Sequence, residues 1–201
     1  MGPMKTWVVT GGAGSGKTLF CKMLADLDPN VRVFFSDQAV HELLADPVTG
    51  AELSKAFGKS VLNDSGAVDR AKMRAMAFAS KRARQRLEKY THPRVYQKLT
   101  KARQEAEAGG VQLFVAEIPL YYEVKSAVPT DQVVLVAARE ASQIKRLAET
   151  RGLDEAGASR ILSAQLPLAQ KIDLAPVVVW NEGSQELLQA QAQLLLQQLA
   201  Q

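Results

Sequence analysis

Several residue types and patterns are scarce or missing in this chain of 201 residues. Only one cysteine, Cys21, is present, which excludes an intrachain disulfide framework and favours a reducing compartment. No run of about 18 apolar residues occurs, so no transmembrane helix is expected. The N-terminus lacks a basic segment followed by an apolar one, so no signal peptide is expected either. These absences predict a soluble, cytoplasmic protein without a membrane partner.

The sequence contains no internal repeat and no low-complexity linker. Hydrophobic residues make up 47% of the chain and charged residues 23%, which is typical of a globular protein of this length. The Gln-rich stretch near the C-terminus is too short for a sustained coiled coil and predicts a packing helix instead. The chain is therefore expected to form one domain, 1–201, with subdomains.

Positive charge is concentrated in one segment, although the net charge is only +4. Between Arg70 and Arg103 there are twelve Lys or Arg residues and a single acidic residue, Glu88. An anionic partner would explain this excess, and solvated helix faces are the alternative. A nucleic acid is disfavoured as that partner, because few aromatic residues that could stack on bases are interleaved with the charges.

The hydrophobic pattern predicts a parallel sheet. Apolar runs with strand character lie at 6–10, 31–35, 111–117, 132–138 and 176–180. Helical patterns lie at 18–27, 140–151, 154–165 and 184–200. Strands that are apolar throughout and alternate with helices are typical of a mainly parallel sheet covered on both faces. A long polar helical block interrupts this alternation after the second strand, which indicates an inserted subdomain.

The stretch "GGAGSGKT" matches G-x-x-x-x-G-K-[ST], with Gly11, Gly16, Lys17 and Thr18 in the defining positions. Glycines allow backbone N–H groups to curl around phosphate oxygens, and the helix that follows adds its N-terminal partial charge. The lysine reaches the β- and γ-phosphates, and the threonine hydroxyl is a Mg²⁺ ligand. The preceding strand and the following helix supply the expected context, so the motif predicts binding of a nucleoside triphosphate.

A carboxylate near the metal is a second requirement, and two candidates follow strands. Glu117 ends the run "LFVAE", and Asp37 lies just beyond "VFFS". Asp37 is equally explained as a helix cap. Which of the two lies nearer Mg²⁺ is left open at this stage. A GTPase is disfavoured, because the chain has no N/T-K-x-D guanine-reading pattern and no switch-like Thr segment.

Further segments accompany this motif in a specific order: "FFSDQAVHELL", "FGKSVLNDSGAVDR", "LEKYTHPRV", "EIPLYYE", "IKRLAETRGLDEAGASRILSAQ" and "VVVWNEGS". Together they resemble the dephospho-coenzyme A kinases, P-loop kinases that catalyse the last step of coenzyme A synthesis. The resemblance covers nearly the whole chain. The P-loop by itself identifies no family, but its combination with the His-Pro pair, P-L-x-x-E and the terminal N-x-G is much more specific.

This resemblance implies an α/β fold, namely a P-loop NTPase three-layer α/β/α architecture with a mainly parallel sheet. It implies a core at about 4–41 and 109–201, a helical acceptor-binding insertion at about 42–108, and a lid at about 145–172. The implied reaction transfers the γ-phosphoryl of ATP, bound with Mg²⁺, to the ribose 3′-hydroxyl of dephospho-coenzyme A. ATP and dephospho-coenzyme A are then the small-molecule partners.

The resemblance also implies roles for individual residues. The implied catalytic residues are Asp37 as the base, Lys17, and the lid arginines Arg146 and Arg151. The implied ATP-binding residues are Gly12, Ala13, Gly14, Ser15, Gly16, Lys17, Thr18, Asn181 and Gly183. The implied acceptor-binding residues are His92, Arg94, Glu117, Pro119, Leu120 and Glu123. Thr18 is the implied Mg²⁺ ligand.

Simpler explanations exist for some of these residues. His92 with the following proline could form a helix-breaking turn, its imidazole bonding a backbone group. Arg146 and Arg151 could be exposed charges on a helix. Cys21 is expected to be a small buried residue and not a catalytic thiol.

Some positions depart from the family pattern. Phe35 and Ser36 replace the first two residues of D-A-D, and Leu168 stands where an arginine is usual. These changes put efficiency and fine positioning in doubt, but not the class of reaction. Two rival functions remain at this stage: another small-molecule or nucleotide kinase of the same fold, and a catalytically weak ATP-binding regulator.

Overall fold

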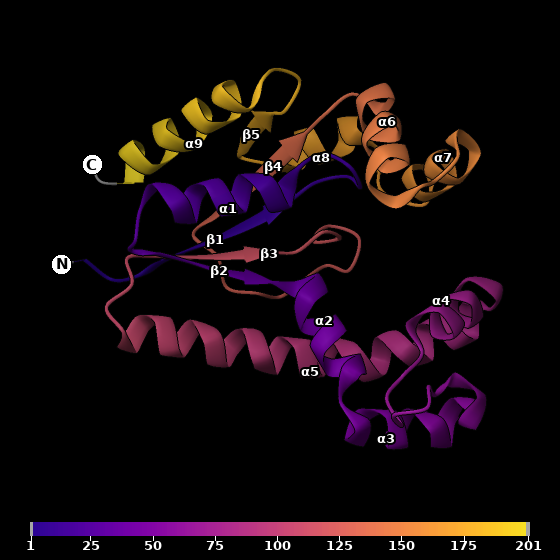
Figure 1. Cartoon of the computed structure of the whole chain (residues 1–201). Helices are drawn as coiled ribbons and strands as arrows, with labels where there is room; N and C mark the ends of the chain where they lie inside the picture. The colour runs from indigo at the N-terminus through magenta and orange to yellow at the C-terminus, as the bar shows by residue number, and fades with distance from the viewer. Residues whose placement is uncertain (1, 200–201) are drawn as a thin grey trace. The chain divides into compact units, whose positions relative to one another are not determined.

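The computed structural model describes residues 2–199, apart from the side chain of Phe78. It contains one sheet, whose strands are β1 (Lys5–Thr10), β2 (Val31–Phe35), β3 (Leu113–Glu117), β4 (Gln132–Ala137) and β5 (Val177–Trp180). The strands pair in parallel in the order β2-β3-β1-β4-β5 (Figure 1). The predicted α/β fold with a mainly parallel sheet is confirmed.

The sheet is buried on both faces, as its uninterrupted apolar strands predict. On one face, Trp7 and Val9 of β1 belong to a core cluster that α1 (Lys17–Leu27) and α9 (Gln185–Leu199) cover. These two helices lie side by side over the sheet (Figure 1). On the opposite face, Val8 is 0% exposed. The core therefore holds β1 rigidly, and the loop that leaves its C-terminal end starts from a fixed point.

Three more helices surround the carboxyl end of β4. They are α6 (Glu140–Arg151), α7 (Glu155–Ser163) and α8 (Leu168–Leu174). Leu147 of α6 and Ala158 of α7 form a small buried cluster with Ala13, a residue of the Gly-rich loop. The sequence pattern did not separate α8, a short helix that begins after Pro167. These helices bring side chains from residues 140–170 against the Gly-rich loop.

The chain forms two compact units. The first contains the sheet and comprises the residues up to Phe35 together with those from Arg103 onward. The second is helical and comprises Ser36–Ala102. Its elements are α2 (Ser36–Ala45), α3 (Pro47–Phe57), the short 3₁₀ helix η1 (Lys59–Val61), α4 (Arg70–Ala79) and most of α5 (Lys81–Ala108).

The helical unit has a core of its own, in which Leu53, Val61 and Met73 are almost fully buried. Two of its helices begin at aspartate caps. Asp46 accepts hydrogen bonds from the N–H groups of Val48 and Thr49 at the start of α3, and Asp69 caps α4 in the same way. Such caps stabilise a helix by about 1 kcal/mol each. Local sequence signals therefore set where these helices begin.

The alternative explanation of His92 and Pro93 as a helix-breaking turn is wrong. The His-Pro pair does not break the helix, because α5 is continuous from Lys81 to Ala108 with Pro93 inside it. Side chains supply hydrogen bonds in this turn: Thr91 Oγ1 donates to the Leu87 carbonyl at 3.0 Å, and the Arg94 guanidinium donates to the Tyr90 carbonyl at 3.1 Å. The residues before α5 form a separate helix, α4.

The division falls at Ser80, between α4 and α5. Ser80 has an extended backbone, and its Oγ accepts a hydrogen bond from the Ala83 N–H at 3.3 Å. A serine at this position acts as a cap for the second helix.

Within the described residues, no helix combines the length and the hydrophobicity that crossing a bilayer requires.

Candidate active site

The Gly-rich loop connects β1 to α1 and is shaped by left-handed glycines. Gly14 has φ 72° and Gly16 has φ 95°, a region that other residues adopt only under strain. A Cβ on Gly16 would also lie 2.1 Å from Nδ2 of Asn181. Helix α1 begins at Lys17, and no side chain caps it at Gly16. The N–H groups at this helix start are therefore available to an anion such as a phosphate.

Side chains from distant elements hold the outer carbonyl groups of the loop. Gln143 of α6 donates from Nε2 to the Ala13 carbonyl at 2.8 Å. Asn181, just after β5, donates from Nδ2 to the Ser15 carbonyl at 2.9 Å. Arg146 in turn donates from Nη2 to the Asn181 carbonyl at 2.7 Å. These bonds fix the orientation of the loop's peptide groups before any ligand is bound.

Gln165 completes this support from the segment between α7 and α8. Its Oε1 accepts a hydrogen bond from the Ala13 N–H at 3.1 Å. Sequence reasoning assigned no role to Gln165 or to Gln143. Gln165 lay within the segment compared with the lid, so a signal was present there, whereas nothing local distinguished Gln143 from any other polar helix residue.

Lys17, Thr18 and Glu117 lie together at the mouth of the loop. The Lys17 side chain is 8% exposed, and its Nζ donates to the Gly12 carbonyl at 2.9 Å. The Thr18 hydroxyl donates to Oε1 of Glu117 at 2.8 Å. Glu117 is the last residue of β3 and is 6% exposed. A hydroxyl and a carboxylate beside a phosphate site are the oxygen ligands that Mg²⁺ uses, usually with waters and substrate phosphates completing its shell.

The Thr18 hydroxyl and the Glu117 carboxylate suit a Mg²⁺ ion that also binds phosphates, and not a metal ion held by protein ligands alone. Among the described residues there is no group of three or more His, Cys, Asp or Glu side chains that could hold a metal ion. A site with one hydroxyl and one carboxylate instead depends on phosphate oxygens for the remaining ligands. A Mg²⁺ ion at this loop would therefore depend on a bound nucleotide for most of its ligands.

Comparison with known proteins shows which family this chain belongs to. A model of the dephospho-CoA kinase family matches residues 6–186. A dephospho-CoA kinase of Carboxydothermus hydrogenoformans is 31% identical over 190 residues, covering 94% of this chain and 91% of that protein. One of Anaeromyxobacter dehalogenans is 36% identical over 198 residues, covering 98% of this chain and 92% of that protein.

The chain belongs to the dephospho-CoA kinase family. Solved structures agree at the level of the fold. A Thermus thermophilus protein called TT1252 aligns with a TM-score of 0.84 and 25% identity, covering 98% of both chains. A dephospho-CoA kinase from Campylobacter jejuni aligns with a TM-score of 0.66 and 22% identity, covering 98% of this chain and 97% of that one. The resemblance inferred from sequence motifs is thus confirmed.

The P-L-x-x-E segment of this dephospho-CoA kinase family member follows β3. The Pro119 carbonyl accepts a hydrogen bond from Thr10 Oγ1 at 3.3 Å, whereas Leu120 is 39% exposed. Glu123 turns inward, where its Oε1 lies 2.8 Å from Nζ of Lys171 and accepts the Leu166 N–H at 3.0 Å. Glu123 therefore ties this segment to α8, and its proposed contact with an acceptor stays a prediction.

The pKa of Glu123 reflects this environment. Burial raises the pKa, but the hydrogen bonds from Lys171 and the Leu166 N–H outweigh it and hold the pKa of the carboxyl below its ordinary value. The pKa of Cys21 is shifted upward instead. Burial raises the pKa of its thiol well above the ordinary value, and the nearby Glu117 raises it further. The thiol therefore stays protonated, which agrees with the expected role of Cys21 as a buried packing residue.

Arg146, Arg151 and Gly183 are the remaining predicted site residues of the sheet-containing unit. Arg146 contacts the loop, and its Nη1 also approaches the Gly14 carbonyl at 3.4 Å. Arg151 ends α6, is exposed, and forms no hydrogen bond or ion pair with another described residue. Gly183 is exposed in the turn after Asn181. The structure thus brings Arg146 and Asn181 to the Gly-rich loop and leaves Arg151 without a partner in the described chain.

The helical unit carries the remaining candidates. Asp37 is exposed in the first turn of α2, and no described group donates a hydrogen bond to its carboxylate, so the capping alternative is wrong. His92 is exposed on α5. Arg94 is engaged within the unit, with its Nη2 3.1 Å from Oε2 of Glu52. None of the three is buried.

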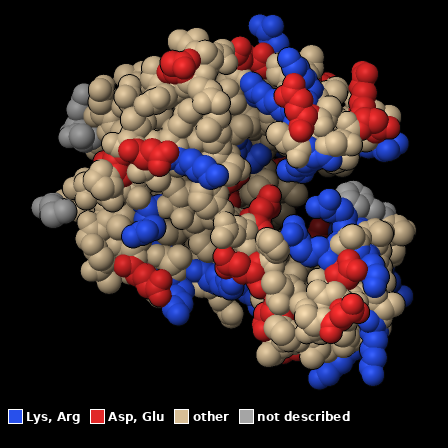
Figure 2. Space-filling view, viewed as in Figure 1, with Lys and Arg blue, Asp and Glu red and all other residues tan. Residues whose placement is uncertain are grey.

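The basic segment is partly neutralised by its neighbours. Figure 2 shows Lys and Arg side chains interspersed with acidic ones over the surface. Arg84 pairs with Glu88 at 3.6 Å, and Lys98 pairs with Glu42 at 3.2 Å. Exposed pairs of this kind contribute little to stability. Ion pairs on solvated helix faces therefore account for part of the charge excess.

Proposed function

We propose that this protein transfers the γ-phosphoryl of MgATP to the ribose 3′-hydroxyl of dephospho-coenzyme A. The observation that carries the proposal is the 2.8 Å hydrogen bond between Thr18 Oγ1 and Glu117 Oε1 at the mouth of the Gly-rich loop. It joins the phosphate site to the metal ligands in a chain that matches the dephospho-CoA kinase family over residues 6–186. The two rival functions have no comparable observation in their favour.

ATP binding uses the loop and the start of α1. The N–H groups of residues 12–18 surround the phosphates, and Lys17 exchanges the Gly12 carbonyl for phosphate oxygens. Because Lys17 is largely buried, its charge acts in a poorly solvated site and interacts strongly with the transferring phosphoryl group. Asn181 and Arg146 contribute by fixing the loop's shape.

Thr18 and Glu117 would hold Mg²⁺ on the nucleotide. When bound, the ion neutralises negative charge on the β- and γ-phosphate oxygens. Thr18 can contribute its hydroxyl oxygen directly, and Glu117 can contribute either directly or by holding a water ligand. Glu117 is thereby assigned to the metal and not to the acceptor, which differs from the role that the family resemblance implied for it.

Phosphoryl transfer needs an oriented hydroxyl more than a strong base. The acceptor oxygen forms a bond to the γ-phosphorus while the bond from that phosphorus to the bridging oxygen of ADP breaks. Asp37 takes the hydroxyl proton, and its exposed carboxylate has no described hydrogen-bond donor competing for it. Arg151, also without a partner among the described residues, is the lid arginine proposed to reach the phosphates.

The experiment is a coupled assay of ADP release with MgATP and dephospho-coenzyme A, with the coenzyme A product confirmed by mass. Asp37→Asn should lower kcat by about a hundredfold or more while leaving ATP affinity unchanged. Lys17→Ala should lose ATP affinity as well. A wild-type protein that binds ATP but forms no coenzyme A would refute the proposed reaction, and acceptors lacking the 3′-hydroxyl serve as the control for simple ATP hydrolysis.

A further inference from the structure

The peptide group between Gly12 and Ala13 is held at both of its polar atoms. Its carbonyl, which belongs to Gly12, accepts a hydrogen bond from Lys17 Nζ at 2.9 Å. Its N–H, which belongs to Ala13, donates to Oε1 of Gln165 at 3.1 Å. The group is trans and planar, so its carbonyl and its N–H point in opposite directions and turn together. Gln165 and the Lys17 ammonium are therefore coupled through one rigid unit.

The side chain of Gln165 starts from a fixed backbone. The Gln165 N–H donates to the Leu162 carbonyl at 3.0 Å. The N–H of the next residue, Leu166, donates to Oε1 of Glu123 at 3.0 Å, and Glu123 is paired with the buried Lys171. The linker between α7 and α8 therefore presents the acceptor oxygen of Gln165 from a set position.

The peptide group that follows in the loop is held as well. Its carbonyl, which belongs to Ala13, accepts a hydrogen bond from Gln143 Nε2 at 2.8 Å. The Ala13 side chain is buried in a cluster with Leu147 and Ala158. Ala13 is thus fixed at its N–H, its carbonyl and its side chain by α6, α7 and the linker after α7. These contacts make Ala13 the residue through which that region of the chain sets the shape of the Gly-rich loop.

The direction of the Gly12 carbonyl matters for an anion. A loop that binds phosphates presents N–H groups to them, and a carbonyl oxygen turned toward the same space would repel a phosphate. The bond from Ala13 to Gln165 keeps this carbonyl directed at the Lys17 ammonium. Rotation of the group would break both hydrogen bonds at once, so the acceptor oxygen of Gln165 stabilises the observed orientation.

We propose that Gln165 is a positioning residue for phosphoryl transfer. It sets the orientation of the Gly12–Ala13 peptide group, and thereby holds the Lys17 ammonium against the loop until phosphate oxygens replace the carbonyl. No contact between Gln165 and a substrate is part of this role. The effect on turnover rests on the proposed function, whereas the effect on the loop does not.

Amide hydrogen exchange tests the effect on the loop. In the isotopically labelled full chain without nucleotide, NMR follows exchange at the single N–H of Ala13. Gln165→Leu removes the acceptor oxygen, so this N–H should exchange about tenfold faster or more, because exchange requires an open hydrogen bond. Gln165→Glu keeps an acceptor oxygen at the same side-chain length and should restore slow exchange.

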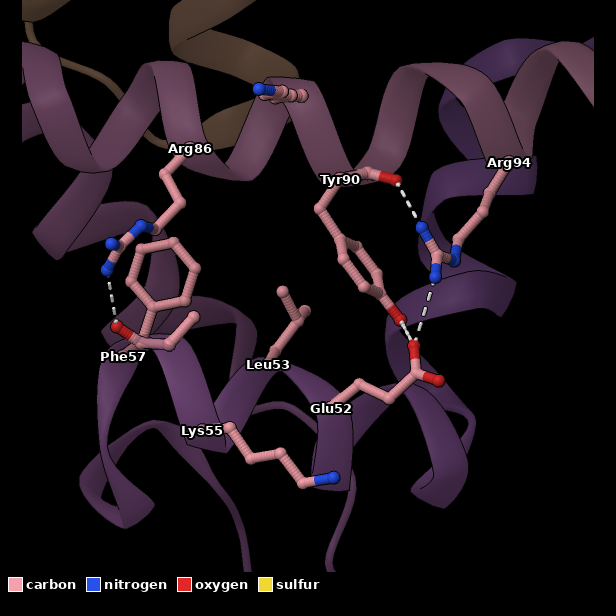
Figure 3. Close-up of a pocket in the computed structure, with 9 residues that line it drawn as sticks. Glu52, Leu53, Lys55, Phe57, Arg86, Tyr90 and Arg94 are labelled. Carbon is pink, nitrogen blue, oxygen red and sulfur yellow. Dashed lines mark hydrogen bonds and ion pairs between the residues drawn. The ribbon is translucent and has the colours of Figure 1, made fainter.

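Two control variants break comparable hydrogen bonds elsewhere. Gln191 of α9 accepts the Trp180 N–H through Oε1 at 3.0 Å, so Gln191→Leu should speed exchange at Trp180 and leave Ala13 unchanged. In the helical unit, Arg86 Nη1 donates to the Ala56 carbonyl at 2.9 Å (Figure 3), and Arg86→Met should also leave Ala13 unchanged. Equally fast exchange at Ala13 in either control would indicate general loosening of the fold and would overturn the proposal.

Turnover tests the consequence for the reaction. With dephospho-coenzyme A as acceptor, kcat/KM for MgATP should fall about tenfold in Gln165→Leu and stay unchanged in Gln191→Leu. Unchanged exchange at Ala13 in Gln165→Leu would overturn the proposal, and so would faster exchange with unchanged turnover. A wild-type protein that binds nucleotide but makes no coenzyme A would refute the proposed function alone. Exchange at Ala13 would still decide in that case whether Gln165 orients the loop.

Discussion

Lys171 and Glu123 form a buried ion pair, with Nζ 2.8 Å from Oε1 and side-chain exposures of 1% and 18%. The pair joins α8 to the segment that follows β3, and the Leu166 N–H donates to the same carboxylate. A lysine enclosed to this degree is tolerated only because the carboxylate is beside it. The segment carrying P-L-x-x-E and the helix α8 are therefore held together by charge.

Breaking this pair should destabilise the protein. Glu123→Gln leaves the Lys171 ammonium buried without its counter-charge, and we expect the free energy of unfolding to fall by about 3 kcal/mol. Urea denaturation measures it. Glu42→Gln is the control, because it breaks the exposed pair with Lys98 and should have little effect. Adding Lys171→Met to Glu123→Gln should restore much of the loss; no recovery in the double variant would contradict the ion-pair explanation.

The same pair predicts a pH dependence. The pKa of Glu123 lies below its ordinary value of 4.5, so the carboxylate stabilises the fold fully above that pH and loses this effect as pH falls through the lower folded pKa. The difference in unfolding free energy between the wild type and Glu123→Gln should therefore be largest near neutral pH and shrink in acid. A difference that stays constant down to pH values of about 3 would rule out this linkage.

Gly16 is required by both its backbone angle and its neighbour. In Gly16→Ala the new Cβ would lie 2.1 Å from Asn181 Nδ2, forcing the Asn181 side chain away from the Ser15 carbonyl. We expect ATP affinity to fall about a hundredfold, since the loop's peptide groups lose their orientation. Gly110→Ala is the matched control: its φ is +74° but no atom lies within 4 Å of the new Cβ.

The control variant separates the effect of backbone strain at a positive φ from the effect of displacing the Asn181 side chain. Gly110→Ala should cost about 1–2 kcal/mol of stability without changing ATP affinity, because a positive φ alone is unfavourable for alanine. Fluorescence titration with an ATP analogue measures both variants. If Gly16→Ala bound ATP as tightly as Gly110→Ala does, Asn181 would not shape the loop.

The Thr18 hydroxyl should determine the requirement for Mg²⁺. Thr18→Val preserves shape but removes the oxygen that bonds Glu117 at 2.8 Å, so the Mg²⁺ concentration needed for half-maximal activity should rise about tenfold or more. Thr18→Ser keeps the hydroxyl and should retain nearly normal behaviour. A Thr18→Val protein with an unchanged Mg²⁺ titration would show that the hydroxyl is not a metal ligand.

Short-range patterns were sufficient for much of the fold. The strands β1 to β5 were predicted within two residues of their observed bounds, because buried parallel strands are continuously apolar. The Gly-rich loop was recognised because its glycines, Lys17 and Thr18 are adjacent in the chain. These features depend on residues that lie within one or two turns of one another.

Other features needed contacts between distant residues. The His-Pro pair was open to explanation as a helix-breaking turn, yet α5 continues through Pro93, where Thr91 and Arg94 add side-chain hydrogen bonds to backbone carbonyls. Glu123 was predicted to bind an acceptor, yet its partner Lys171 lies 48 positions later in the chain. Gln143 and Gln165 could not be assigned for the same reason.

The sequence by itself determined the parallel sheet, the phosphate-binding loop and the kinase family, since each is written in local spacing or in the order of motifs. Only the tertiary structure decided which polar side chains hold that loop, which carboxylate lies beside Thr18, and which cations of the basic segment form ion pairs. Hydrogen bonds and ion pairs act over about 3 Å in space, and one sequence does not state which distant residues folding brings within that range.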